Sequence, residues 1–116
     1  MQRLSEKEFL ERFPLREPSN EMGGVAPGEL SVGQDTCISG IVEGDVFVSG
    51  GLHLVVDGIV EGDVHVDAGA VAYVHGTVEG DLIVQGAAFV DGVIEGDIRG
   101  ARDSAVYAAR EGWVTA

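Results

Sequence analysis

An unbroken two-residue alternation over residues 38–100 is the feature that most constrains the fold of this chain. All 32 even-numbered positions from Ile38 to Gly100 are Gly, Ala, Val, Leu or Ile, whereas every charged residue and every His in this stretch occupies an odd position. Successive side chains of a β-strand point to opposite faces, so this period separates an inward apolar set from an outward polar set. Because the phase survives over the whole stretch, the turns must fit the same period.

A tetrapeptide repeat lies in phase with this alternation. Val-Glu-Gly-Asp occurs at 42–45, 60–63 and 78–81, and Ile-Glu-Gly-Asp at 94–97. Spacings of 18, 18 and 16 residues suit one coil of a solenoid made of short strands, with Gly at the inward corners. The pattern predicts an all-β chain folded as a parallel β-helix of about four coils of 16–18 residues. An antiparallel meander is the alternative, because Asp57-Gly58 and Asp91-Gly92 are typical hairpin dipeptides.

The segments on either side of the repeat carry signals of their own. We expect three parts: a short helix plus linker over residues 1–30, the β-helix over 31–103, and a C-terminal cap or tail over 104–116. Ser5-Glu6-Lys7-Glu8 is a capping-box pattern and Pro14 ends the segment, which predicts a helix over about 6–13. The last segment could form helical turns or a final strand, with Trp113 as a plug.

The predicted helix has an apolar face made of Phe9, Leu10 and Phe13. The open end of a solenoid exposes apolar side chains and unpaired backbone groups, so we expect these three residues to form an end-cap. An arm that docks on another molecule is the alternative. The Pro- and Gly-rich residues 17–33 then form a linker, extended along the flank of the solenoid.

Charge is distributed very unevenly along the chain. The net charge is −13, and residues 17–98 contain 15 acidic residues and no Lys or Arg. Such a body disfavours nucleic acids and anionic membrane surfaces as partners and favours basic proteins or cations. The sequence has neither an apolar run long enough to span a membrane nor a secretory leader, and its single cysteine, Cys37, suits a reducing cytoplasm. We therefore expect a cytoplasmic location.

Stacking the coils in phase predicts parallel rows of outward side chains. Two acidic rows, one of Glu and one of Asp, would run between two largely apolar rows. An acidic block bordered by apolar area combines fast encounter with tight contact. We expect the partner-binding surface to comprise Ile41, Glu43, Asp45, Phe47, Ile59, Glu61, Asp63, His65, Glu79, Asp81 and Ile83.

The sequence gives little support for an enzyme. The paired carboxylates would lie on an open convex face, where no surroundings shift their pKa values towards acid–base catalysis. Nucleophile triads, phosphate-binding loops and zinc-ligand spacings are missing from the pattern. We therefore expect no catalytic residues, no metal and no cofactor.

The repeat resembles that of the bactofilins. Gly58-Ile59-Val60-Glu61-Gly62-Asp63-Val64 and the copies beginning at Gly40, Gly76 and Gly92 carry the resemblance, which covers about residues 39–100. It implies a right-handed parallel β-helix and a bacterial scaffold protein that polymerises end to end without a nucleotide. The present chain has fewer coils than is usual in that family, and its flanks carry aromatic and capping residues.

Two functions follow as hypotheses. The first is a structural scaffold that self-associates through its β-helix, as the resemblance implies. The second is a small acidic binding protein, such as an immunity protein or inhibitor, that neutralises a basic toxin or enzyme through its Glu and Asp rows. The partner is another copy of the chain in the first case and a basic protein in the second.

Overall fold

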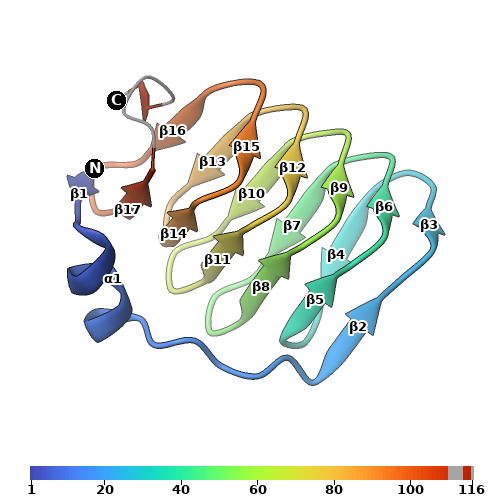
Figure 1. Ribbon diagram of the computed structural model, residues 1–116, viewed down its shortest axis with the longest axis horizontal. Helices are drawn as coiled ribbons and strands as arrows, with labels where there is room; N and C mark the ends of the chain where they lie inside the picture. The colour runs from blue at the N-terminus through green and yellow to red at the C-terminus, as the bar shows by residue number, and fades with distance from the viewer. Residues whose placement is uncertain (110–113, 116) are drawn as a thin grey trace.

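The computed structural model describes residues 1–109 and 114–115, and it forms a right-handed parallel β-helix (Figure 1). Each coil contributes one strand to each of three parallel sheets, so strands far apart in sequence lie side by side. Five complete coils run from β2 to β16, one more than the predicted number. No helix among the described residues has both the length and the apolar character needed to cross a membrane.

The three sheets are listed here in the spatial order of their strands. The seven-stranded sheet contains β1 (Gln2–Arg3), β17 (Ala105–Ala108), β14 (Ala87–Val90), β11 (Val71–Val74), β8 (His53–Val56), β5 (Thr36–Ile38) and β2 (Asn20–Met22). The six-stranded sheet contains β18 (Val114–Thr115), β16 (Ile98–Gly100), β13 (Leu82–Val84), β10 (Val64–Val66), β7 (Val46–Val48) and β4 (Leu30–Val32). The five-stranded sheet contains β15 (Val93–Ile94), β12 (Thr77–Val78), β9 (Ile59–Val60), β6 (Ile41–Val42) and β3 (Val25–Ala26).

The alternation in the sequence is confirmed as the inside–outside pattern of the solenoid. The even-numbered residues of the strands fill the interior, and Val42, Val60 and Val78 are fully buried. Pairing keeps this phase, since even residues pair with even residues on the next coil, as Val60 does with Val78. The interior is therefore one continuous stack of aliphatic side chains, which excludes the meander.

The additional coil is the first one, and it lies in the segment that we expected to be a linker. Val25 and Ala26 of β3 pair with Ile41 and Val42 of β6, so Ala26-Pro27-Gly28-Glu29 occupies the place of the repeated tetrapeptide. Only Gly is retained in this copy, which explains why the repeat is hard to see. The β-helix thus begins at Asn20 rather than at residue 31.

The predicted N-terminal helix is present as α1 (Glu6–Arg12). Ser5 caps it, because its hydroxyl accepts the Glu8 N–H while the Glu8 carboxylate accepts the Ser5 N–H, both at 3.1 Å. These hydrogen bonds satisfy donors that helix starts leave unpaired. They also lower the pKa of Glu8.

The expected position of this helix was wrong. Phe9, Leu10 and Phe13 do not cover an end of the solenoid but pack on the outward face of the seven-stranded sheet, near Tyr73 and Phe89. Those two aromatic side chains occupy odd, outward positions, and an apolar outer face needs a cover. The Tyr73 hydroxyl completes the contact by donating to the Phe13 carbonyl at 2.7 Å.

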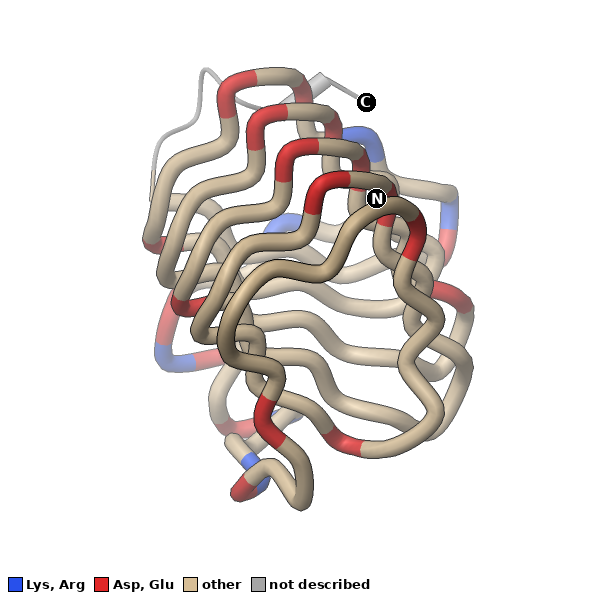
Figure 2. Tube along the Cα trace, turned by 90° about the vertical axis from the view of Figure 1, so that its right-hand side faces the viewer, with Lys and Arg blue, Asp and Glu red and all other residues tan. Residues whose placement is uncertain are grey.

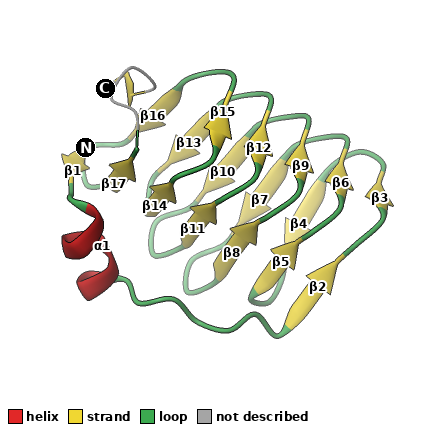
Figure 3. Ribbon diagram, viewed as in Figure 1, coloured by secondary structure: helices red, strands yellow, loops and turns green. Residues whose placement is uncertain are grey.

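The path of the chain follows from this packing (Figure 3). It begins at β1 beside the last coil, forms α1 on the flank, runs along the solenoid and starts the first coil at the far end. Arg16 anchors this connection through hydrogen bonds to the Asp35 carboxylate and the Gly51 carbonyl. Residues 105–108 form strand β17 rather than helical turns, whereas Trp113, the expected plug, lies outside the described residues.

Candidate functional site

The predicted acidic surface exists, and its two rows differ in structure. Figure 2 shows acidic segments repeated at the same place on successive coils. The Glu row lies fully on the surface; its members are Glu43, Glu61, Glu79 and Glu95, all exposed. It is free to contact a partner.

The Asp row is part of the framework. The Oδ1 atom of Asp45 accepts the backbone N–H of Asp63 at 2.8 Å, and the Oδ1 atom of Asp63 accepts that of Asp81 at 2.7 Å. Asp81 accepts from Asp97 in the same way, at 2.8 Å. Each of these half-buried carboxylates therefore replaces a missing backbone acceptor at a corner of the coil. Its Oδ1 atom is engaged in the fold rather than reserved for a partner.

This hydrogen bond explains the Gly that precedes each Asp in the repeat. A Cβ atom on Gly62 would collide with the Asp45 carboxylate and with the backbone of Gly44. Gly80 and Gly96 have the same relation to Asp63 and Asp81. The Gly-Asp pair is thus one structural unit, in which Gly leaves room for the carboxylate of the preceding coil.

The rows beside the carboxylates are only partly apolar and exposed. Ile41, Ile59, Phe47 and Ile83 are half-buried, so each shows only part of its apolar surface. The exception is Val93, whose side chain is 44% exposed beside the Glu row. The imidazole of His65 stacks on the ring of Phe47, with centroids 4.6 Å apart and planes 8° from parallel.

Positive charge reaches the acidic rows only at one end within the described residues. The Arg99 guanidinium lies 3.8 Å from Asp81 and 3.7 Å from Asp97. At the other end, Asp45 and Asp63 have no such cation among the ion pairs of residues 1–109, and His65 is their nearby basic group. The two ends of the Asp row therefore have different electrostatic surroundings.

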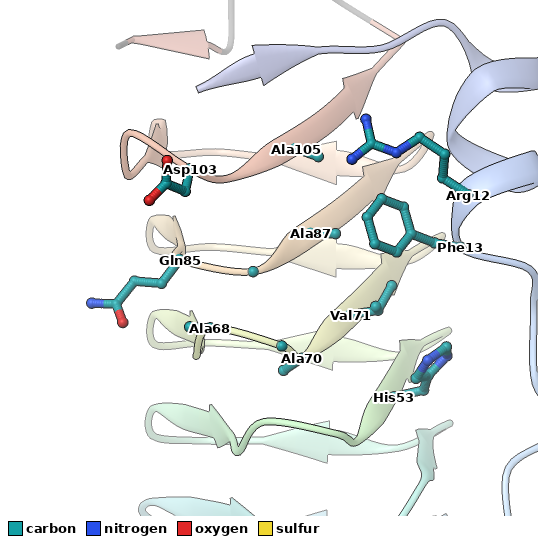
Figure 4. Close-up of a pocket in the computed structure, with 12 residues that line it drawn as sticks. Arg12, Phe13, His53, Ala68, Ala70, Val71, Gln85, Ala87, Asp103 and Ala105 are labelled. Atoms are coloured by element: carbon teal, nitrogen blue, oxygen red, sulfur yellow. The ribbon is translucent and has the colours of Figure 1, made fainter.

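A groove of about 430 Å³ runs between α1 and the seven-stranded sheet (Figure 4). Arg12 and Phe13 lie on its helix side, and Gln85 and Asp103 lie on the opposite side. Its floor consists of small or short side chains that are almost completely buried, namely Ala70, Val71, Ala87 and Ala105. These floor side chains therefore offer little accessible surface to a small ligand.

His53 lines the lower part of this groove, and one of its ring nitrogens lowers the stability of the fold. Its Nδ1 atom is buried and has no hydrogen-bond partner. Burial lowers the pKa of His53, and the Arg16 guanidinium shifts the pKa in the same direction. The Asp35 carboxylate, which accepts the backbone N–H of His53 at 2.9 Å, shifts the pKa the other way, but its effect is smaller. The ring is therefore neutral at physiological pH.

The two ends of the solenoid are built differently. At the last coil, β1 extends the seven-stranded sheet and β18 extends the six-stranded sheet. At the first coil, β2, β3 and β4 are the terminal strands of all three sheets, and no described segment pairs with their outer edges. Met22, Ala26 and Leu30 of this coil are half-buried beside the core, and Val25 is 59% exposed. In Figure 2 this end faces the viewer.

Two further side-chain pairs lie on odd positions away from these surfaces. The Cys37 thiol donates to the Asp57 carboxylate at 3.4 Å, and the pKa of Cys37 rises to about 11 because of burial and then of this hydrogen bond. Nδ1 of His75 lies 2.6 Å from the Asp91 carboxylate. Among the described residues, neither pair lies beside a nucleophile and a base arranged for catalysis. We therefore interpret both pairs as local structural contacts.

Comparison with known proteins gives no relative for this chain. Protein-family models, curated proteins and solved structures were compared with it, and none of them matches. The surfaces described above therefore carry the functional argument.

Proposed function

We propose that this protein is a non-enzymatic, bactofilin-like structural scaffold that self-associates through its β-helix. The observation that carries the proposal is the open first coil. Strand edges present backbone donors and acceptors that pair readily with another chain. Three such edges surround one end of the core here, next to the partly exposed side chains of Met22 and Leu30.

Alternation of the backbone groups identifies the donors that a second copy would meet. Asn20 and Leu30 donate their N–H groups to the backbone carbonyls of Asp35 and Asp45 in the second coil. The N–H groups of Glu21 and Ser31, one residue further along each strand, therefore point away from the second coil. These outward groups make β2 and β4 the pairing edges.

Strand β3 is less suited to pairing because Pro27 follows it. Pro27 occupies the place in the first coil that Glu43 occupies in the second. The Glu43 N–H donates to the Ala26 carbonyl of the first coil at 2.9 Å. Proline has no N–H, and edge strands use it to limit pairing. The contact between two copies should therefore rest on β2, β4 and the side chains at the end of the core.

The difference between the ends bears on how far assembly proceeds. Two copies that meet through their first coils bury the open edges of both, whereas an approach to the last coil meets β1 and β18. We therefore expect a dimer as the basic unit, with longer assemblies only where β1 is displaced. Glu21 and Glu29 would approach their own copies, so added salt should strengthen the association.

Sedimentation velocity over a wide range of protein concentration tests the proposal. The sedimentation coefficient of the native chain should rise to a dimer, and Ser31→Pro, which removes one outward N–H, should shift that rise to higher concentration. Glu79→Gln, in the middle of the Glu row, is the control and should associate at least as readily as the native chain. A monomer at all concentrations would contradict the proposal.

The exposed Glu row supports a second candidate, an acidic protein that binds and neutralises a basic toxin or enzyme. Four exposed carboxylates on a rigid scaffold give a regular negative surface, bordered by the exposed Val93. Electrostatic steering by such a row is salt-sensitive. The double change Glu61→Gln and Glu79→Gln should then weaken capture of a basic protein and reduce the salt dependence, whereas a pure scaffold would show neither effect.

A further inference from the structure

We infer that Asp45, Asp63 and His65 form a binding site for a divalent transition-metal ion of the zinc, cobalt or nickel class. Each residue offers one ligand atom, and the three atoms lie within 4.8 Å of one another. An ion about 2.0–2.2 Å from each nitrogen or oxygen ligand requires the ligands to approach one another slightly more closely. Small side-chain rotations achieve this, because all three residues are half-buried rather than locked in the core.

The imidazole of His65 makes this group chemically different from the rest of the acidic row. In the other four complete coils, the position of His65 is occupied by Ser31, Phe47, Ile83 or Arg99. Among the described residues, only this part of the row places two neighbouring carboxylates beside an imidazole nitrogen. Imidazole together with carboxylate favours zinc-class ions, whereas sites made of carboxylate and carbonyl oxygens alone suit calcium or magnesium.

The surrounding contacts orient the three ligands. The Oδ1 atoms of Asp45 and Asp63 accept the N–H groups of Asp63 and Asp81, which orients both carboxylates and leaves each Oδ2 atom outside these hydrogen bonds. The stacked ring of Phe47 restricts the rotation of His65. Such supporting contacts orient metal ligands and reduce the ordering that binding requires.

The negative charge at the Asp45–Asp63 end of the Asp row also favours a bound cation. Arg99 lies within ion-pair distance of Asp81 and Asp97, whereas no Lys or Arg among residues 1–109 forms an ion pair with Asp45 or Asp63. A bound divalent ion would balance these two carboxylates and join the second coil to the third. Water would complete its coordination, since the site is open to solvent.

Titration of the full-length chain, prepared without a polyhistidine tag, with zinc chloride tests this site. Calorimetry should give one ion per chain, and NMR should show selective shifts of the His65 imidazole signals while those of His75 stay in place. His75 is an internal control, because it has a carboxylate contact with Asp91 but belongs to no three-ligand group among the described residues. Binding should also raise the melting temperature.

Matched variants separate a defined site from general attraction to the acidic surface. Asp45→Asn and Asp81→Asn each remove one charge from the same row, and each keeps an oxygen that can accept the N–H of the next coil. Asp45→Asn and His65→Gln should weaken zinc binding by at least about tenfold, whereas Asp81→Asn should change it little. Equal weakening by both Asp variants, or zinc binding without a shift at His65, would overturn the inference.

Discussion

Gln2 pairs with Ala105, so the beginning of the chain extends the sheet beyond its last complete coil. The Gln2 N–H donates to the Ser104 carbonyl at 2.7 Å, and the Leu4 N–H donates to Val106 at 2.9 Å. From there the chain travels the length of the solenoid before the first coil begins. The N-terminal segment therefore covers the β17 edge at one end and one flank of the solenoid, and it leaves the edges of the first coil unpaired.

Removal of residues 1–16 should convert limited association into larger assemblies. The truncation exposes the edge of β17, which β1 covers in the intact chain, so that both ends become available for pairing. Light scattering and electron microscopy would detect assemblies larger than dimers. The truncation also uncovers the apolar flank, which could aggregate without order. Adding Ser31→Pro to the truncated chain separates the two processes. Ordered growth needs pairing at both ends, so Ser31→Pro should stop it. Growth unaffected by Ser31→Pro would indicate aggregation.

The Asp row should respond to mutation in a way that the Glu row does not. Asp63→Ala leaves the N–H of Asp81 without its acceptor and should lower the free energy of unfolding by about 1–3 kcal/mol. Asp63→Asn keeps an acceptor and relieves repulsion, so its stability should match or slightly exceed that of the native chain. Denaturant unfolding measures both, with Glu61→Ala as an exposed control that should change stability little. Equal stability of the Ala and Asn variants would refute the structural role of Asp63.

His53 should make the fold less stable in mildly acidic solution. Because burial lowers its pKa in the folded state, the unfolded chain binds the proton more readily once the pH falls below the ordinary value of 6.5. The stability that the neutral ring contributes is complete above that pH and is lost as the pH falls towards the lowered pKa. His53→Val, which copies its partner Val71, should lose less stability between neutral pH and about pH 5. Parallel stability curves for the two proteins would contradict this assignment.

The Cys37 thiol should react slowly with alkylating reagents. The thiolate is the reactive form, and a pKa of about 11 keeps it scarce at neutral pH. Asp57→Asn removes the negative charge next to the sulfur and should accelerate alkylation by iodoacetamide, whereas Asp67→Asn, the same change at another exposed aspartate, should not. Mass spectrometry of the modified chain follows the rate. Rapid alkylation of the native protein would show that Cys37 is more accessible than its surroundings indicate.

Periodicity allowed the core and its topology class to be predicted from the sequence. The even positions fill the interior because a strand period of two continues through turns that also have even spacing. The helix near residues 6–13 was predictable because its start depends on local hydrogen bonds between Ser5 and Glu8. These features rest on contacts between near neighbours or on strict repetition.

The remaining features depend on long-range packing that the sequence pattern does not reveal. Tyr73 and Phe89 occupy outward positions, and only the fold shows that Phe9 and Phe13 cover them. The role of the Asp row was missed because its hydrogen bonds join residues 16 or 18 positions apart. The part of the first coil before residue 30 was missed because only Gly28 of the tetrapeptide is retained there, although Val25 and Leu30 keep the spacing of the repeat.

Amide hydrogen exchange at different protein concentrations tests association through the open first coil most directly. The N–H groups of Glu21, Val25 and Ser31 point out of the solenoid at that end and should exchange quickly in the dilute protein. At concentrations where sedimentation shows dimers, exchange at Glu21 and Ser31 should slow, while amides of the last coil should keep their rates. Dimers without added protection at Glu21 and Ser31, or with protection confined to the last coil, would contradict the account.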